Sequence, residues 1–124
     1  MVSLEKLSPL CEIRKDKYER NAHYLTFRSR PAVVTIRVVF DDPQSGADMV
    51  ITNMTTMPGH KRGKGHGTKA LTALLAWARD EGLMHIEAVQ VQRPAESFWT
   101  KNGFLKKHNV TNDFLLSKKE IATH

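Results

Sequence analysis

Residues 62–67 of the sequence, RGKGHG, decide how the rest of the chain is interpreted. They follow a predicted strand over 48–56 and precede a predicted helix over 68–81. Because this turn carries three glycines in five positions, little side chain stands in the way, and successive backbone amides can point inward to hold an anion. The first turn of the following helix has unpaired amides and a partial positive charge, so it favours an anion at the same place. The stretch therefore predicts a phosphate-binding loop.

The loop and a second stretch downstream resemble two signatures of the GNAT family of N-acyltransferases. Residues 62–67 fit each fixed position of the pattern Gln/Arg-x-x-Gly-x-Gly/Ala, which in the family follows the fourth strand and grips the pyrophosphate of acetyl-CoA. Residues 97–104, SFWTKNGF, resemble the FYxKxGF signature, with Trp99 where tyrosine is usual. Two patterns in the right order are more specific than either alone, and the likeness covers roughly half of the chain, from Asp48 to Phe104.

The resemblance implies both a fold and a reaction. The implied fold is α/β, or α+β in some schemes: a mixed, mostly antiparallel sheet flanked by helices, with a minimal N-terminal region and one domain over residues 1–124. The implied reaction moves an acetyl group from acetyl-CoA to an amine by direct attack in a ternary complex. The residues that the resemblance places at the cofactor are Thr56, Met57, Arg62, Gly63, Lys64, Gly65, His66, Gly67, Thr68, Gln92 and Trp99.

The groups that would carry out the transfer are marked less clearly than the loop. The reaction needs a deprotonated amine, an amide donor for the thioester carbonyl and a proton for the leaving thiolate. In the family a backbone amide of the strand before the loop serves the carbonyl, and here this falls within residues 55–57. The usual base is a glutamate on that strand, but residues 49–57 contain none. The remaining candidates, each with a purely structural role as the alternative, are Asn53, Thr55, His60 and Glu87.

The family's proton donor is commonly the tyrosine of FYxKxGF. Trp99 cannot replace it, because an indole NH is only a hydrogen-bond donor and far too weak an acid. Three alternatives follow: Tyr18 or Tyr24 reaches the site, water protonates the sulfur, or the chain binds CoA without transferring an acyl group. For Trp99, packing beside Phe98 and Phe104 against the sheet is compatible with a place along the pantetheine channel.

The positive charge of the chain is concentrated around the loop. Lysine and arginine number 19 against 13 aspartates and glutamates, a net charge of +6, and no acidic residue occurs between Met49 and Arg79. The basic residues and histidines of this interval are His60, Lys61, Arg62, Lys64, His66, Lys69 and Arg79. An anionic partner is expected there, and either CoA or nucleic acid would satisfy the charge. No nucleic-acid-binding motif accompanies the loop, so nucleic acid is the third interpretation.

Two other phosphate-binding patterns fit less well. A Walker loop needs four residues between its first glycine and Gly-Lys, and residues 59–64 are one residue short. Residues 65–70 fit the G-x-G-x-x-A of dinucleotide folds, with Glu87 about 20 residues further on. Only about 55 residues remain, however, and a Rossmann unit needs more alternating strands and helices than these provide. The simplest alternative is a basic, glycine-rich connection without a ligand.

Hydrophobic patterns predict the other elements of the chain. The predicted strands cover 23–28, 32–40, 48–56, 84–92, 104–107 and 113–118, the last two as a closing hairpin, and a short helix runs from 94 to 103. The N-terminal residues 1–21 are ambiguous: Leu10, Ile13 and Tyr18 have loosely helical spacing, whereas Cys11 and Ile13 alternate as in a strand. Ser8 followed by Pro9 could cap a short helix there.

This short N-terminal region affects the acceptor side of the site. GNAT proteins usually have one or two helices after the first strand, and these cover the acceptor. Residues 1–21 have room for at most one short helix. We therefore expect an acceptor side that is either open, which suits a protein or peptide amine, or completed by the second subunit of a homodimer.

Length and composition set few further limits. A hydrophobic content of 40% with 26% charged residues is ordinary for a soluble globular protein, and 124 residues suit one domain. The longest apolar run, over 70–78, is shorter than the roughly 20 residues that cross a bilayer, and the N-terminus is not a secretory signal. A cytoplasmic protein without a membrane partner is expected. The single Cys11 cannot form an internal disulfide, and the six histidines show no metal spacing, so no metal site is predicted.

Overall fold

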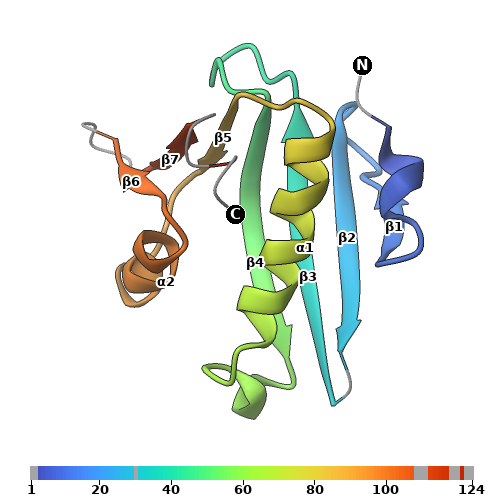
Figure 1. The fold of residues 1–124 in the computed structure, drawn as a ribbon, viewed down its shortest axis with the longest axis vertical. Helices are drawn as coiled ribbons and strands as arrows, with labels where there is room; N and C mark the ends of the chain where they lie inside the picture. The colour runs from blue at the N-terminus through green and yellow to red at the C-terminus, as the bar shows by residue number, and fades with distance from the viewer. Residues whose placement is uncertain (1–2, 30, 108–111, 118–120, 122–124) are drawn as a thin grey trace.

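The structure is a computed structural model that describes residues 3–29, 31–107, 112–117 and 121. Within these residues a seven-stranded sheet has the order β1-β2-β3-β4-β5-β7-β6 (Figure 1). The strands are β1 (Glu12–Lys15), β2 (Ala22–Ser29), β3 (Ala32–Phe40), β4 (Met49–Met57), β5 (His85–Ala88), β6 (Leu105–Lys106) and β7 (Phe114–Ser117). The helices are α1 (His66–Asp80) and α2 (Glu96–Lys101), with 3₁₀ turns η1 (Leu4–Leu7), η2 (Gly59–Lys61) and η3 (Arg93–Ala95). The predicted mixed, mostly antiparallel sheet with flanking helices is confirmed.

Neighbouring strands run antiparallel except for β4 and β5. These two are parallel and meet over three residue pairs, from Met49↔Ile86 to Ile51↔Ala88. The Val89 amide adds a hydrogen bond to the Ile51 carbonyl at 3.1 Å. Beyond Ile51, β4 continues beside β3 alone, and Figure 1 shows it extending well past the end of β5. Only the first part of β4 therefore joins the two halves of the sheet.

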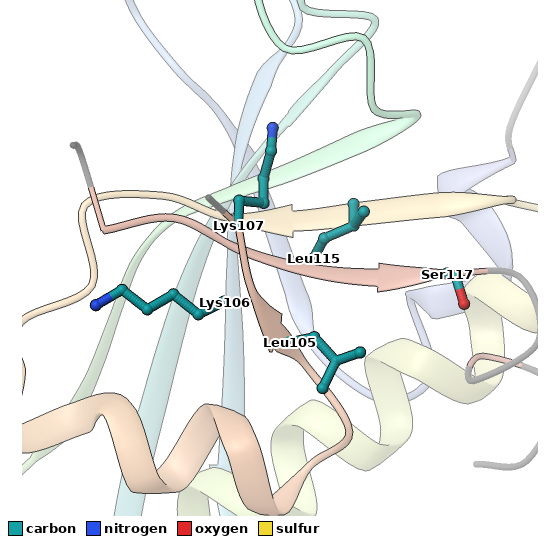
Figure 2. A pocket seen from close by; sticks show the side chains of 5 residues that line it. All are labelled: Leu105, Lys106, Lys107, Leu115 and Ser117. Carbon is teal, nitrogen blue, oxygen red and sulfur yellow. The ribbon is translucent and has the colours of Figure 1, made fainter. Parts of the chain in front are cut away.

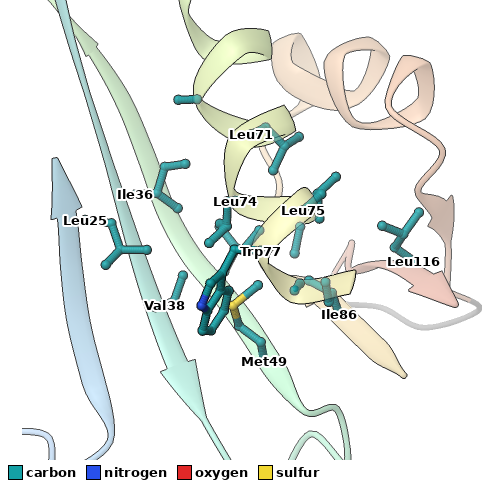
Figure 3. Close-up of a cluster of buried hydrophobic side chains, with 14 of the residues drawn as sticks. Leu25, Ile36, Val38, Met49, Leu71, Leu74, Leu75, Trp77, Ile86 and Leu116 are labelled. Carbon is teal, nitrogen blue, oxygen red and sulfur yellow. The ribbon is translucent and has the colours of Figure 1, made fainter. Parts of the chain in front are cut away.

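Helix α1 covers the sheet because one of its faces is apolar. The buried residues of that face are Ala70, Leu71, Leu74, Leu75, Trp77 and Ala78. They pack on strand side chains such as Leu25, Ile36 and Met49 (Figure 3). The helix begins after Gly65 and ends before Gly82, and both glycines have positive φ, of 87° and 78°. No helix in the described part of the chain is long and apolar enough to span a membrane.

The opposite face of the sheet is more polar. Along β3, Val34, Ile36 and Val38 are buried in the core under α1, whereas Thr35 and Arg37 between them are half-buried on the other side, because successive strand residues alternate. No helix residue of the described chain joins the small apolar cluster of that side, which consists of Ala22, Val39, Ala47, Val50 and Val89. The described helices thus leave this face uncovered.

Several element boundaries differ from the sequence predictions. The strand predicted over 84–92 is shorter in the structure, where it consists of β5 alone. It ends before Gln90, which has a φ of 52° and whose amide bonds to Asp113 Oδ1 at 2.9 Å. The helix predicted over 68–81 begins two residues earlier, and the short helix predicted over 94–103 is η3 followed by α2. The closing hairpin is confirmed as β6 and β7, while 108–111 and 118 lie outside the described residues.

The ambiguous N-terminal segment contains both a short helix and a strand. The helix is η1, and Ser8 ends it instead of capping a later one: its hydroxyl donates to the Glu5 carbonyl at 2.7 Å. Cys11 and Ile13 alternate because the chain enters β1 at this point. Both side chains pack in or against the core. Over the described part of this region, residues 3–21, η1 is the single short helix, in agreement with the prediction of at most one.

A tight turn over residues 16–21 connects β1 to β2, without a helix between them. Asp16 Oδ1 accepts hydrogen bonds from the amides of Tyr18 and Glu19, at 2.8 and 2.9 Å. An aspartate that bonds the backbone two and three residues ahead stabilises such a turn locally. The described residues therefore lack the helices that GNAT proteins usually carry after the first strand.

The packing of α1 predicts the response to one core truncation. Leu74→Ala should lower the free energy of unfolding by about 3 kcal/mol, because Leu74 is fully buried between α1 and the sheet. Thr72→Ala, on the exposed side of the same helix, should change it by less than about 0.5 kcal/mol. Urea denaturation measures both, and similar losses in the two variants would show that α1 is not docked as described.

Candidate functional site

Two glycines with positive φ shape the loop between β4 and α1. Gly63 has a φ of 77° and Gly65 of 87°, a conformation that other residues rarely adopt. A Cβ added at either position would meet no atom within 4 Å. The need for glycine is therefore conformational, and the space beside the backbone is open.

The backbone amides of this loop are free over a continuous stretch. The Arg62 amide bonds to the Gly59 carbonyl at 3.2 Å, and the Lys69 amide makes the first helical bond, to the Gly65 carbonyl at 3.1 Å. Between them, the amides of residues 63–68 have no acceptor among the described residues. The last three lie in the first turn of α1, where the helix dipole favours negative charge. Free amides at a helix start suit a phosphate group.

Side-chain charge adds to the backbone. Arg62, Lys64 and Lys69 are exposed, and none forms an ion pair with a described residue. His66 is half-buried, and its Nδ1 atom has no hydrogen-bond partner there. The structure thus places unbonded backbone amides and three exposed cationic side chains within residues 62–69, whereas the Nδ1 atom of His66 is buried from solvent.

Gly67 has a different role from the other two glycines. It lies in the first turn of α1, and a Cβ there would stand 3.2 Å from Met54 Cε and 3.5 Å from Phe98 Cε1. An added Cβ would require the flexible end of Met54 to shift by a few tenths of an ångström and would be in ordinary contact with Phe98, so the first turn of α1 packs closely on both side chains. The absent side chain therefore places the free amides close to the second half of β4.

That second half of β4 has an unpaired edge. The chain that follows β5 turns away toward β7: the Val91 amide bonds to the Asn112 carbonyl at 3.1 Å, and Asn112 Nδ2 donates to the Val91 carbonyl at 2.6 Å. From Asn53 to Met57, β4 pairs with β3 but with no described strand on its other side. An extended ligand arm could bond to these free backbone groups.

The predicted cofactor residues outside the loop are placed unevenly. Thr56 is half-buried and Met57 is exposed, both on the unpaired part of β4. Gln92 is exposed at the start of η3. Trp99 is only 6% exposed, and its ring makes edge contacts with Phe98 and Phe104 at centroid distances of 5.2 and 5.0 Å. The packing alternative for Trp99 is therefore observed.

Sequence reasoning considered Phe98 only as a packing partner of Trp99, although it is the aromatic of this stretch that lies beside the loop. Its ring contacts the start of α1 at Gly67, whereas the neighbouring Trp99 points into the core. The first aromatic of the FYxKxGF-like stretch was a visible signal. Which of two adjacent aromatics faces the loop depends on how α2 packs, and the sequence pattern alone does not specify that.

The two catalytic candidates do not come together. Asn53 is exposed on β4, opposite Arg37 of β3. Glu87 is 3% exposed on β5, accepts a hydrogen bond from Ser45 Oγ at 2.8 Å and pairs with Lys107 Nζ at 3.1 Å. Since its Oε2 atom is engaged by both partners in the closed part of the sheet, the structural role given as its alternative accounts for its burial. Asn53 is free to contact solvent or a ligand.

A polar network lies beside Asn53 on the face without helices. Arg37 donates from Nε to Asp16 Oδ2 at 3.2 Å, from one terminal nitrogen to Glu19 Oε2 at 3.1 Å and from the other to Thr52 Oγ1 at 2.9 Å. The amides of Glu19 and Tyr18, together with Arg37, lower the pKa of Asp16 to about 2. The carboxylate is therefore charged at neutral pH, and the network holds the β1–β2 turn against β3 and β4.

A shallow cavity of about 190 Å³ lies elsewhere, on the β6–β7 hairpin. Its lining residues are Leu105, Lys106, Lys107, Leu115 and Ser117 (Figure 2). None of the predicted site residues lines it. The cavity therefore does not bear on the loop.

The other reactive groups of the described residues lie apart from the loop. The described residues contain no group of three histidine, cysteine or acidic side chains placed to hold a metal ion. Cys11 is buried, and burial raises its pKa to about 11, so it stays a thiol at neutral pH. Its Sγ lies 3.6 Å from the Leu7 carbonyl, which agrees with the interpretation of Cys11 as a small core residue.

The sheet separates after one short parallel contact, and a basic, glycine-rich loop at the start of a helix follows the separated strand, which defines an α/β domain of mixed topology. The chain belongs to the GNAT family: residues 7–104 match the model of the Acetyltransferase (GNAT) family. The matched segment runs from η1 to the end of the FYxKxGF-like stretch and includes the loop. No curated protein matches the sequence.

Solved structures share the fold at low sequence identity. Tetrahymena GCN5 superposes with a TM-score of 0.63 at 11% identity, covering 81% of this chain and 70% of that one. The KacTA–DNA complex gives 0.56 at 12% identity, with 82% and 70% covered. AtaTR bound with AcCoA gives 0.54 at 11% identity, with 82% and 72% covered. At such identities the likeness concerns the fold alone.

The low pKa of Asp16 predicts how stability depends on pH. A carboxyl group whose pKa falls from 3.8 unfolded to about 2 folded stabilises the protein fully above about pH 4, and this contribution disappears as the pH falls toward 2. Asp16→Asn should therefore lower the free energy of unfolding at pH 7, and its difference from the unmodified chain should shrink between pH 4 and pH 2. Urea denaturation across this range measures it. Asp80→Asn, an exposed helix-end carboxylate, is the control; a difference that does not change with pH would contradict the prediction.

Proposed function

We propose that the chain is an acetyl-CoA-dependent N-acetyltransferase, acting as one domain over residues 1–124 in the cytoplasm. One observation carries the proposal: the unbonded amides of residues 63–68 run into the start of α1, where Gly67 packs against Met54 in the part of β4 that has no described strand on its other side. A diphosphate and an extended pantetheine arm need these two surfaces side by side. Membership of the GNAT family supports the same ligand, and AtaTR is a fold neighbour whose structure was solved with AcCoA.

The donors present suit the chemistry of acetyl-CoA. Diphosphate oxygens would accept hydrogen bonds from the loop amides, and Arg62, Lys64 and Lys69 would balance their charge. Thr56 and Met57 would lie along the pantetheine arm, and an amide within residues 55–57 would face the thioester carbonyl. Such a donor stabilises the negative charge that grows on the carbonyl oxygen during attack.

Proton transfers would rely on water more than on protein groups. Asn53 and Thr55 are exposed on β4 and could orient a water that takes the amine proton. Tyr18 is 88% exposed at the β1–β2 turn, and the Tyr24 ring is stacked below Arg14, 4.4 Å from the guanidinium carbon. Neither placement favours a tyrosine as the proton donor to the leaving thiolate. With Trp99 in the core, water would protonate the leaving thiolate.

The acceptor would approach the sheet face that carries no described helix. Asn53, Thr55 and Met57 alternate on this face and are all exposed. Because no described helix narrows the approach, a protein or peptide amine is the proposed acceptor. A homodimer in which the second subunit completes this side is the alternative.

Two other functions make different predictions. A non-catalytic CoA-binding protein would bind acetyl-CoA without releasing thiol in the presence of amines, and the absence of a glutamate on β4 favours this alternative. A nucleic-acid-binding module would use the same basic loop, and KacTA is a fold neighbour whose structure was solved with DNA. Calorimetric titration with acetyl-CoA and with a DNA oligomer separates the two ligands, and thiol release across an amine panel separates enzyme from passive binder.

The loop can be tested with a matched pair of glycine substitutions. Gly65→Glu should weaken acetyl-CoA binding by roughly 100-fold or more, because a carboxylate in the anion site costs several kcal/mol in repulsion and each 1.4 kcal/mol is tenfold. Gly46→Glu is the control: Gly46 also has a positive φ, 76°, and open space beside it, but lies in the turn before β4. Isothermal titration calorimetry gives both affinities.

The two variants share added charge and backbone strain, so a loss confined to Gly65→Glu isolates the effect at the loop. Circular dichroism verifies that both are folded. Unchanged acetyl-CoA affinity in folded Gly65→Glu would refute the assignment of this loop.

A further inference from the structure

We propose that Arg37 is a positioning residue: by holding Thr52, it sets the bulge of β4 and thereby the unpaired strand edge that takes the pantetheine arm. The inference rests on the proposed function, because it concerns the same ligand. It adds a group from β3 and the β1–β2 turn, neither of which belongs to the loop or to the FYxKxGF-like stretch.

The bulge lies where β4 leaves β5. In the register with β3, Arg37 is opposite Asn53 and Val38 is opposite Ile51, so Thr52 has no partner. Ile51 is also the last β4 residue that pairs with β5. A bulge bends its strand and increases the local twist. The conformation at Thr52 therefore determines the direction in which the rest of β4 runs.

The side chain of Thr52 anchors this bulge by bonding to Arg37, and it forms no hydrogen bond with any other described residue. Its hydroxyl accepts a hydrogen bond from an Arg37 terminal nitrogen at 2.9 Å and lies 3.5 Å from the Arg37 carbonyl oxygen. A bulged residue lacks the ladder bonds that would hold an ordinary strand residue. The contact with a charged donor supplies a restraint in their place.

Arg37 is itself fixed in one orientation. Asp16 and Glu19 accept from its other donors at 3.2 and 3.1 Å, and its side chain is only 18% exposed. Its guanidinium carbon lies 5.7 Å from the centre of the Tyr24 ring. With three hydrogen-bond partners and a neighbouring ring, the guanidinium cannot turn toward a ligand without breaking contacts. Its role is therefore to hold Thr52 and not to bind the acceptor.

Asp16 is in turn bound by the turn that replaces the missing helices. Its second oxygen accepts from the amides of Tyr18 and Glu19. The short β1–β2 turn thus connects, through Arg37, to the point where β4 separates from β5. In this chain the β1–β2 turn would stabilise β4, the strand that faces the ligand, without covering the acceptor side of the site.

The test compares two ligands that share the nucleotide half. Acetyl-CoA has the pantetheine arm, and 3′-phosphoadenosine 5′-diphosphate lacks it. Thr52→Val removes the hydroxyl but keeps the shape, so it should weaken acetyl-CoA about tenfold and leave the affinity for the nucleotide within about twofold. Thr52→Ser keeps the hydroxyl and should restore acetyl-CoA binding. Thr35→Val, on the same face of the sheet and without a described side-chain hydrogen bond, should change neither affinity.

Arg37→Met provides a second, independent variant. If Arg37 acts through Thr52, the double variant Arg37→Met/Thr52→Val should lose no more acetyl-CoA affinity than the weaker-binding single variant. Additive losses, equal weakening of both ligands, failure of Thr52→Ser to restore binding, or a Thr52→Val variant that binds like Thr35→Val would each overturn the inference. If the unmodified chain binds neither ligand, the proposed function itself fails, and that outcome is distinguishable from all of these.

Discussion

The three parallel residue pairs between β4 and β5 are the contact on which the rest of the structure depends. They join the halves of the sheet, while Leu75 of α1 shares a core with Met49 of β4 and Ile86 of β5 (Figure 3). Because the pairing stops at Ile51, the backbone groups beyond it face no strand of the described chain on that side. Unpaired backbone groups must meet water or a ligand. The separation of β4 from β5 thus leaves backbone groups that a ligand can bind.

Positive charge is concentrated in the loop that follows β4, the strand that separates from β5. The interval from Met49 to Arg79 contains no acidic residue, so nothing within it neutralises the cations of the loop. The free amides of residues 63–68 and the start of α1 add partial charges of the same sign. The carboxylates of the β1–β2 turn, in contrast, are already paired with Arg37. The exposed cations of the loop are therefore not neutralised by any carboxylate of the described residues.

Local patterns predicted most of the elements but not their exact ends. The positive φ of Gln90 shortens β5, and it is stabilised by Asp113, 23 residues away. The orientation of Phe98 and Trp99 follows from the docking of α2, and the engagement of Glu87 depends on Ser45 and Lys107. Each of these outcomes requires a partner that sequence spacing does not bring into view.

The sequence by itself determined the glycine loop, its charge, the helix after it and the strands before it, because glycine conformation, helix amphipathicity and strand alternation depend on residues close together in the chain. Only the tertiary structure decided that β4 bulges at Thr52 and that Arg37 holds it together with Asp16 and Glu19. Those hydrogen bonds join residues 15 to 21 positions apart. They exist because strand pairing brings the residues together, and no local pattern encodes that geometry.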